Sequence, residues 1–498
     1  MEGRVSGNVA AVDLGATSGR VIIGHVGPGE LRLEQVARFP NQPVRSNEGV
    51  GAEGESQYGL HWNILELYRS LTEGLGTAIR SQPELASIGI DAWAVDYALL
   101  RGGRMLGVPY HYRDDRTAAG VAAVHGVIGA DELYQRNGLQ QLPFNTVFQL
   151  AADRASGDLA AADGMLLIPD LIGYWLTGVA RAEITNASTT GLLDPVKRSW
   201  DTELLARTGV PASLLPALIE PGQVLGPLLP AVAAELGGNT GGARAARRSQ
   251  PISVIAVGSH DTASAVVAVP ATGPDFAYIS SGTWSLVGVE LDHPLISEAG
   301  RAANFTNEGG VDRRVRYLKN VSGLWLLSES VRTWERTSRA TIDLPTLLAQ
   351  ADAVTSPVAV FDASDERFIA PGDMPARIAS WCVEHGMPAP QSPAEFTRSI
   401  IESLAAAYAD TIELAASLTG TSIAAIHVVG GGSQNALLCQ LTADRTGRPV
   451  LAGPVEATAI GNVLVQARAN GMLDGSLESL RALVAATFVP RRYEPRGR

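Results

Sequence analysis

The sequence predicts an α/β protein with two domains. Its 498 residues exceed the length at which a single hydrophobic core usually stops growing. Helix-like and strand-like runs alternate along the second half, which is typical of the α/β class. A strand–turn–strand pattern at residues 9–23 has a counterpart at residues 276–289. This repetition indicates two related halves that face each other across a cleft.

The elements of the first half follow from apolar periodicity and turn residues. The segment 9–23 reads as a hairpin because glycines interrupt two apolar runs. Asn63 has the side chain of an N-cap, with Glu66 three residues later, and predicts a helix towards Arg80. The remaining elements are strands at 31–39, 88–91 and 95–100, and a mixed strand–helix segment at 163–177 that ends at Gly178.

The middle of the chain contains the predicted domain boundary. Residues 231–250 are rich in alanine, glycine and arginine without apolar periodicity, so we expect an exposed loop there. The predicted domains are therefore residues 1–251 and 252–498. The later elements are a strand at 252–257, the hairpin at 276–289, a long helix after Ser392, a strand at 426–429, and helices after Ser433 and Glu456.

Composition excludes several functions. The formal net charge of -12 argues against broad nucleic-acid binding. The only lysines are Lys197 and Lys319, and neither lies in a glycine-rich loop. A P-loop needs a lysine after its glycines, and no GxxxxGK[ST] or protein-kinase VAIK pattern occurs. Nucleotide chemistry therefore requires another scaffold.

The expected location is the cytoplasm. Cys382 and Cys439 form neither a CxxC pair nor a zinc pattern, so they read as free thiols in a reducing compartment. The N-terminus lacks the pattern of a signal peptide, and no apolar run is long enough to span a bilayer. Neither a membrane nor a nucleic acid is an expected partner, and the oligomeric state stays open between monomer and dimer.

Two glycine-containing turns, one in each half, could grip an anion. In the segment 13–20, Gly15 and Gly19 allow backbone N–H groups to approach an anion closely. Asp13, at the strand end, offers oxygen ligands to a hydrated magnesium ion. Ser281-Gly282-Thr283 offers a similar turn. Each is also compatible with an ordinary hairpin, and the presence of both is more informative than either alone.

A third glycine turn occurs at Gly430-Gly431-Gly432, between an apolar strand and a helix. Three glycines remove every Cβ, so a flat ligand can lie against the backbone. The helix N-terminus adds partial positive charge. The pattern is not a dinucleotide fingerprint, and a plain strand-to-helix turn remains the alternative.

Asp261 is the candidate catalytic group. It lies in Ser259-His260-Asp261-Thr262, at the junction of a buried strand and a helix. Phosphoryl transfer to an alcohol needs an acceptor for the hydroxyl proton, and a positioned aspartate can serve. His260 and Thr262 could hydrogen-bond sugar hydroxyls. The alternative is that Asp261 or Ser259 is simply a helix N-cap.

Taken together, these segments give the chain a family resemblance. It resembles the FGGY carbohydrate kinases and, within them, the kinases that act on L-rhamnulose. The segments that carry this resemblance, in order, are VDLGATSGR, GIDAWAVDYALL, YRDDRT, GLQQLPFNTVFQL, IPDLIGYWLTG, TNASTTGLLDP, VGSHDTASAV, YISSGTWSLVGVE, NFTNEGG, YLKNVSGLWLL, VVGGGSQN and AGPVEATAIGN. They extend over nearly the whole chain, and SHDTASA, SSGTWS and KNVSGLWLL are the most specific.

The resemblance implies a fold and an activity. The fold would be two ribonuclease-H-like domains, as in actin, Hsp70 and sugar kinases, flanking a catalytic cleft. The activity would be magnesium- and ATP-dependent phosphorylation of L-rhamnulose at its 1-hydroxyl. Alternatives are another ketose, such as L-fuculose or D-xylulose, or a catalytically idle sugar- or nucleotide-sensing protein.

The resemblance also implies residue roles. Asp261 would accept the proton of the sugar hydroxyl. The sugar contacts would be Ala94, His260, Asp261, Thr262 and Asn320. The nucleotide contacts would be Ala16, Thr17, Ser18, Gly19, Arg20, Thr283 and Gly431.

Two residues depart from the family pattern. Ala94 stands where a glycine is frequent, and its methyl group would narrow the sugar pocket. Ser328 replaces a glutamine that commonly reaches the nucleotide, so that contact is not expected. The segment 231–250 looks longer than the usual connection, and we expect no catalytic consequence.

Other conspicuous residues have simpler interpretations. Trp93, Phe144 and Trp284 could line the methyl end of the sugar, but large aromatic residues are more often core. The charged run 113–116 reads as a solvated helix start. The pair Asp91 and Asp96 resembles glycosidase carboxylates only superficially, because nothing in the sequence fixes their separation.

Overall fold

The chain divides into two compact units of mixed helices and strands, which confirms the predicted α/β class. The computed structural model describes residues 6–50, 56–237 and 251–497. The first unit comprises Met1–Ala268, Leu291–Tyr317 and Ala457–Thr487, and the second comprises Val269–Glu290, Leu318–Glu456 and Phe488–Arg498. The chain thus first changes unit at Ala268–Val269, whereas the sequence suggested a boundary between residues 251 and 252. The reason is that the strand after residue 252 pairs within the first sheet.

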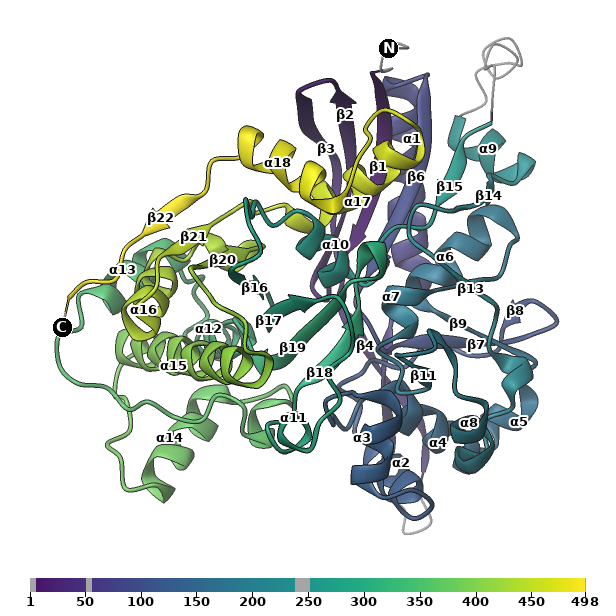
Figure 1. Ribbon diagram of the computed structural model, residues 1–498. Coiled ribbons are helices and arrows are strands. Elements are labelled where there is room, and N and C mark those ends of the chain that lie inside the picture. Colours follow the sequence, from purple (N-terminus) through teal and green to yellow (C-terminus); the bar gives the residue numbers. More distant parts are fainter. Residues whose placement is uncertain (1–5, 51–55, 238–250, 498) are drawn as a thin grey trace. The chain divides into compact units, whose positions relative to one another are not determined.

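The first unit is built on a six-stranded sheet with the order β14-β15-β6-β1-β2-β3 (Figure 1). Its strands are β1 (Gly7–Leu14), β2 (Ser18–Gly27), β3 (Glu30–Pro40), β6 (Leu85–Ala92), β14 (Val224–Pro227) and β15 (Ser253–Ile255). β1 and β2 form the predicted hairpin, in which Asp13 is opposite Arg20. β6 runs parallel to β1 and sets Asp91 beside Asp13.

Two helices cover opposite faces of this sheet. Gly74 of α1 (Ile64–Ser81) lies against Val21, whereas Gly24 lies against Val463 of α17 (Ala457–Ala469). Residues 21 and 24 of β2 differ by an odd number, so their side chains point to opposite faces. The short helix α10 (Asp261–Val267) packs on α17. Because α17 covers the sheet, this packing holds α10, the helix that begins at Asp261, close to the same sheet.

A second core of the first unit lies around α2 (Thr117–His125) and α4 (Thr146–Ser156). The remaining elements are β4 (Pro43–Val50), β5 (Ser56–Trp62), β7 (Tyr97–Arg101), β8 (Arg104–Met105), β9 (Gly164–Leu167), β10 (Ala182–Glu183), β11 (Leu193–Asp194), β12 (Ser199–Trp200), β13 (Leu218–Ile219), β18 (Thr306–Gly309), α3 (Ala130–Asn137), α5 (Asp158–Ala161), α6 (Ile168–Thr177), α7 (Ile184–Ala187), α8 (Thr202–Thr208), α9 (Pro230–Gly237), α11 (Glu298–Ala302) and α18 (Leu477–Thr487). The predicted end of α6 is confirmed, because Gly178 is its left-handed C-cap.

The second unit is built on strands in the order β19-β17-β16-β20-β21-β22. These are β16 (Phe276–Ser281), β17 (Trp284–Leu291), β19 (Val315–Ser322), β20 (Ala425–Val429), β21 (Val450–Ala452) and β22 (Arg491–Tyr493). The antiparallel β16–β17 pair confirms the second predicted hairpin. The helices are α12 (Trp325–Ser338), α13 (Leu344–Asp352), α14 (Met374–Glu384), α15 (Pro393–Thr419) and α16 (Ala436–Thr446).

Two local expectations were wrong in part. Residues 231–237 belong to α9 rather than to an exposed loop, and Leu236 is buried; residues 238–250 lie outside the described residues. Asn63 occupies the N-cap of α1, but its side chain makes no capping hydrogen bond among the described residues. Glu66 instead accepts hydrogen bonds from Arg69, whereas Ser392 forms a full capping box with Glu395. The part of the chain described here contains no helix long and apolar enough to cross a membrane.

The contact between α10 and α17 leads to a stability prediction. A Cβ on Gly461 would lie 1.8 Å from the carbonyl oxygen of Ser264, a backbone atom that cannot rotate away. We expect Gly461→Ala to lower the free energy of unfolding by about 2–3 kcal/mol, the cost of overpacking. Chemical denaturation measures this. Gly107→Ala is the control, because no described atom lies within 4 Å of its added Cβ. Equal stability of the two variants would contradict the prediction.

Candidate active site

The segment before α10 is anchored by the buried carboxylate of Glu183. Ser259 donates to Glu183 Oε2 through its backbone N–H at 2.9 Å and its Oγ at 2.8 Å. The N–H of Thr185 donates to Oε1 at 2.9 Å, and the N–H of Ala92 donates to Ser259 O at 2.9 Å. Burial raises the pKa of Glu183, while these hydrogen bonds stabilise its charged form. Glu183 therefore fixes the backbone that leads into Asp261.

Asp261 begins α10, and its carboxylate is not used as a helix cap. The N-cap is His260, and the described residues show no side-chain hydrogen bond at this cap. Asp261 Oδ1 accepts a hydrogen bond from Thr262 Oγ1 at 3.0 Å, and 29% of the Asp261 side chain is exposed. The backbone N–H and the hydroxyl group of Ser259 both donate hydrogen bonds to Glu183 and not to the helix. The N-cap alternative is therefore wrong for both Asp261 and Ser259, and the Asp261 carboxylate is accessible for chemistry.

Two further carboxylates lie side by side at the end of the central strands. Asp13 is 5% exposed, and its Oδ2 lies 3.8 Å from Arg20 Nε. Asn462 Nδ2 donates to Asp91 Oδ2 at 2.5 Å, whereas no described residue donates to the buried Oδ1. Burial, together with the charges of Asp13 and Asp261, raises the pKa of Asp91 well above its ordinary range. Three carboxyl groups, those of Asp13, Asp91 and Asp261, are thus concentrated in this part of the site.

The turn between β1 and β2 is built as an open cradle. Asn41 Nδ2 donates to Gly15 O at 2.8 Å, and the N–H of Asn41 donates to Thr17 O at 3.0 Å. A Cβ on Gly19 would lie 2.3 Å from the Phe39 ring, so this position needs glycine. The backbone N–H groups of Ala16 and Thr17 have no acceptor among the described residues. Ser18 and Arg20 are half-buried at the start of β2. Adjacent free N–H groups suit an anion.

The second unit contains the other predicted nucleotide residues. Thr283 lies in the β16–β17 turn, where Gly282 and Thr283 carbonyls accept from Leu324 at 3.0 Å and Trp325 at 3.2 Å. Asn320 lies half-buried in β19, and Ser328 is exposed on α12.

The three glycines after β20 have different surroundings. A Cβ on Gly432 would lie 2.0 Å from Ser281 Oγ, and one on Gly430 would lie 3.0 Å from Ser281 O. Gly430 also has φ 81°, which glycine tolerates. Of the three, only Gly431 has no described atom within 4 Å of an added Cβ. Gly430 and Gly432 therefore serve packing, while Gly431 alone leaves room for a ligand.

Ala94 lies on a strained turn. Val95 has φ 69°, an unusual value for a β-branched residue, and Asp96 N–H donates to Ala94 O at 2.9 Å across it. Thr146 Oγ1 donates to Val95 O at 2.7 Å. Such strain persists only where the surroundings enforce it, and it is common at functional sites. Ala94 is the half-buried residue of this turn, between the buried Trp93 and Val95.

The buried carboxylate of Asp96 stabilises this turn through hydrogen bonds. Its carboxylate accepts from Trp62 Nε1 at 2.6 Å, Trp93 Nε1 at 3.0 Å and Gln149 Nε2 at 2.9 Å. Trp93 and Phe144 are buried, with exposures of 4% and 8%, whereas Trp284 is half-buried in the second unit. Asp96 therefore organises a core of hydrogen-bonded indoles rather than forming a carboxylate pair with Asp91.

The charged run 113–116 precedes α2 as expected, with Arg116 at its N-cap, but it is solvated only in part. Asp114 is 7% exposed and accepts from the N–H of Leu60 at 2.7 Å. Arg116 is paired with the buried Asp153. Burial with specific partners explains why the charges are tolerated.

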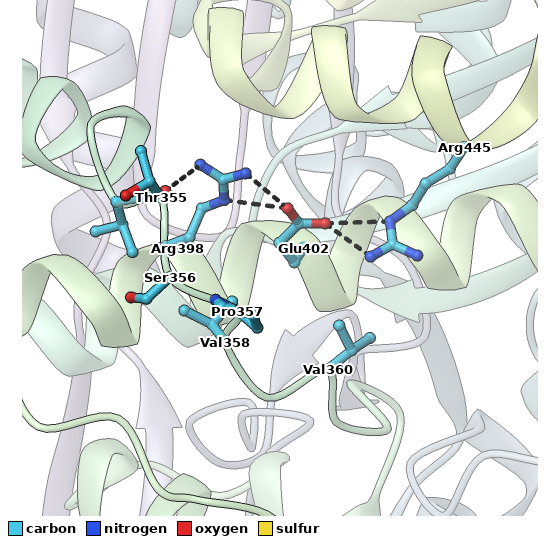
Figure 2. Close-up of a pocket in the computed structure, with 9 residues that line it drawn as sticks. Thr355, Ser356, Pro357, Val358, Val360, Arg398, Glu402 and Arg445 are labelled. Carbon is cyan, nitrogen blue, oxygen red and sulfur yellow. Dashed lines mark hydrogen bonds and ion pairs between the residues drawn. The ribbon is translucent and has the colours of Figure 1, made fainter. Parts of the chain in front are cut away.

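A groove of about 250 Å³ lies in the second unit, beside α13 and α15 (Figure 2). It is lined by Val354, Thr355, Ser356, Pro357, Val358, Val360, Arg398, Glu402 and Arg445. Glu402 accepts from both arginines, at 2.9 Å from Arg398 and 2.7 Å from Arg445. Arg398 also donates to Val354 O at 3.2 Å. The groove contains none of the predicted site residues, and its charges are paired with one another.

Comparison with known proteins decides the family. Residues 9–267 match the N-terminal domain of the FGGY family of carbohydrate kinases, and residues 277–470 match its C-terminal domain. The chain belongs to the FGGY family of carbohydrate kinases. A rhamnulokinase of Pectobacterium carotovorum is 43% identical over 497 residues, covering 98% of this chain and 93% of its own. One of Bacteroides thetaiotaomicron is 40% identical over 491 residues, covering 98% and 96%.

Solved structures confirm the predicted sugar-kinase fold for this FGGY protein. A gluconate kinase from Lactobacillus acidophilus has a TM-score of 0.75 at 17% identity, covering 99% of this chain and 94% of its own. A glycerol kinase from Plasmodium falciparum, solved with ADP, has a TM-score of 0.72 at 15% identity, covering 98% and 94%. At such low identity the likeness shows the fold alone.

Sequence reasoning missed the residues that support the site. Glu183 and Asn462 are buried and polar, and they reach Ser259 and Asp91 from positions 76 and 371 residues away. TNASTTGLLDP begins two residues after Glu183, and AGPVEATAIGN ends at Asn462, but no local pattern indicates which side chains these two residues contact. A single carboxylate in a segment of small and apolar residues, 182–193, is the one signal that could have identified Glu183.

The anchor at Glu183 leads to a prediction. In Glu183→Gln an N–H₂ group replaces one acceptor, so a buried donor faces another donor. We expect a loss of about 1–3 kcal/mol in the free energy of unfolding, and a lower kcat because Asp261 shifts. Denaturation and steady-state kinetics measure these. Glu73→Gln, on the exposed face of α1, is the control. A fully active, fully stable Glu183→Gln protein would refute the anchor.

The environment of Asp96 leads to a prediction about pH. Burial raises the pKa of Asp96 from 3.8 to about 7, against the hydrogen bonds that lower it. Between pH 4 and pH 7 the folded protein keeps a proton that the unfolded chain has lost, so the contribution of Asp96 to stability falls as pH rises. We expect the stability difference between wild type and Asp96→Asn to change by up to ~4 kcal/mol across this interval. Denaturation at a series of pH values tests this, and a constant difference would contradict it.

Proposed function

We propose that this protein transfers the γ-phosphoryl group of ATP to the 1-hydroxyl of L-rhamnulose. The observation that carries the proposal is Asp261, an anchored and partly exposed carboxylate that caps no helix. The relatives named rhamnulokinase, 40–43% identical over nearly the whole chain, support the choice of sugar.

In the proposed reaction, Asp261 accepts the proton of the sugar hydroxyl. The sugar oxygen attacks the γ-phosphorus, a new O–P bond forms, and the bond to the β–γ bridging oxygen breaks. ADP leaves with the electron pair of that bond. Asp261 need not be a strong base, because alignment and charge stabilisation do most of the work in phosphoryl transfer.

The nucleotide would be held by backbone groups. The N–H groups of Ala16 and Thr17, which have no acceptor among the described residues, would bind phosphate oxygens, with Ser18, Gly19 and Arg20 completing the turn. Arg20 would contribute positive charge. Thr283 and Gly431 are the proposed nucleotide contacts of the second unit, and the open space at Gly431 supports this assignment.

Magnesium fits the acidic end of β1 and β6. Oδ1 of Asp91, which has no hydrogen-bond partner among the described residues, and the neighbouring carboxylate of Asp13 are hard oxygen donors. The described residues contain no cluster of three or more ligating side chains, so the ion would keep water ligands. Asp13 would bind the magnesium ion, and Asp91 would lie beside this site. When bound, magnesium neutralises phosphate charge.

The sugar would contact His260, Thr262, Asn320 and Ala94. The methyl group of Ala94, held on the strained Val95 turn, would narrow the pocket. ATP as the phosphoryl donor is consistent with a cytoplasmic location, which is part of the proposal.

A panel of ketoses tests the choice of substrate. Specificity is the ratio of kcat/KM values, so L-rhamnulose, L-fuculose and D-xylulose are compared in a coupled ADP assay. The proposal requires L-rhamnulose to have the highest kcat/KM. A higher value for either of the other sugars would reassign the substrate, and sugar binding in calorimetry without turnover would favour a sensing protein.

The role of Asp261 leads to a kinetic prediction. Asp261→Asn keeps the shape of the side chain but removes the proton acceptor, so we expect kcat to fall by roughly 10²–10⁴-fold. The KM for ATP should change little, because Asp261 is not a proposed nucleotide contact. Asp292→Asn, at an exposed carboxylate paired with Arg314, is the control. Near wild-type turnover by Asp261→Asn would remove Asp261 as the base.

A further inference from the structure

Three buried polar residues lie next to Asp261: Arg316 contacts both Glu308 and His260, and His260 directly precedes Asp261. Arg316 on β19 is fully buried, at 0% exposure. Its Nε donates to Gly309 O at 2.9 Å, and its Nη1 lies 3.1 Å from Glu308 Oε2. Its Nη2 lies 3.0 Å from Nδ1 of His260. All these residues belong to the first unit, because the first three residues of β19, up to Tyr317, are part of that unit.

The contact between Arg316 and His260 assigns the proton of the imidazole ring. A guanidinium has only N–H donors and stays protonated, so it cannot accept a hydrogen bond. Nδ1 of His260 must therefore supply the lone pair. The ring is then neutral, with its proton on Nε2. Glu308 Oε2 is 3.3 Å from the same Nδ1, but Arg316 contacts both groups and neutralises the carboxylate.

The other ring nitrogen of His260 lies close to the candidate base. Nε2 of His260 lies 3.4 Å from Asp261 Oδ1, the oxygen that also accepts from Thr262 Oγ1 at 3.0 Å. An N–H here attracts the carboxylate, whereas a lone pair would repel it. Both contacts are to Oδ1, and no described residue donates to Oδ2. The two oxygens of Asp261 are thus distinguished by their surroundings.

We propose that Arg316 and Glu308 are positioning residues that hold His260 as the Nε2–H tautomer, so that Oδ1 of Asp261 is fixed and Oδ2 receives the proton of the substrate. The kinetic part of this inference rests on the proposed function, and the tautomer does not. Without Arg316, Glu308 becomes the nearest partner of Nδ1. The ring would then donate from Nδ1 to Glu308 and turn its Nε2 lone pair towards Asp261.

The test reads the tautomer directly in the protein without substrate. Two-bond ¹H–¹⁵N spectra of ¹⁵N-histidine-labelled protein distinguish a protonated ring nitrogen from one with a lone pair, and His260→Gln identifies the signal of His260. Wild type should show Nε2–H. Arg316→Met should show Nδ1–H or a mixture, whereas Arg316→Lys keeps a donor and should keep Nε2–H.

Kinetics test the consequence for Asp261. We expect Arg316→Met to lower kcat by ~10–100-fold, the size of effect that a misplaced catalytic group produces, with little change in the KM for ATP. Arg316→Lys should recover most of the loss. Arg481→Met is the matched control, because Arg481 is also a buried arginine of this unit, at 3% exposure, and contacts Val266 O of α10 rather than His260.

The outcomes separate this inference from the proposed function. A His260 ring with Nδ1–H or both nitrogens protonated in wild type would overturn the tautomer. The expected tautomer with unchanged kcat in Arg316→Met would overturn the positioning role, as would an equal kcat loss in Arg481→Met. If the wild type shows Nε2–H but phosphorylates no ketose, the proposed function fails while the ring assignment stands.

Discussion

The carboxylate of Glu183 is the interaction on which the site depends most. Burying a charged group is costly unless donors surround it, and Glu183 is surrounded by N–H and hydroxyl groups from Thr185 and Ser259. Because Ser259 directly precedes His260, these bonds fix the start of α10. The contact of Gly461 with Ser264 fixes the same helix along its length. Asp261 is therefore held by rigid elements, although its own side chain has few partners.

The same region concentrates unfavourable groups. Asp13 and Asp91 are adjacent buried carboxylates, and the charge of Asp261 also acts on Asp91. Val95 is held at φ 69° beside Ala94. Such features lower stability by themselves and are tolerated where surrounding contacts over-determine them. Asn462 on α17 and the donors around Asp96 supply these contacts. In this unit, the residues that stabilise the structure are therefore different from the residues proposed to act in the reaction.

Much of this architecture is predictable from the sequence because its signals are local. The two hairpins, the α6 end at Gly178 and the capping box at Ser392 each depend on neighbouring residues. The expected loop at residues 231–237 is helical instead, since burial of Leu236 outweighs a weak pattern. The charged run 113–116 is partly buried because its partner Asp153 is distant in sequence. Supporting residues such as Glu183, Arg316 and Asn462 become recognisable only when long-range contacts are known.

The family resemblance identifies candidate roles, and the geometry gives them physical content. Gly431 is open while its neighbours are packed, and Asp261 has one oxygen with partners and one without among the described residues. The central claim is that this site directs phosphoryl transfer to the 1-hydroxyl of L-rhamnulose. The most direct measurement is two-dimensional ¹H–³¹P NMR of the product formed from ATP, magnesium and L-rhamnulose. The account predicts phosphorus coupled to the protons on C1. Phosphate on another carbon, or ADP formation without a sugar phosphate, would contradict it.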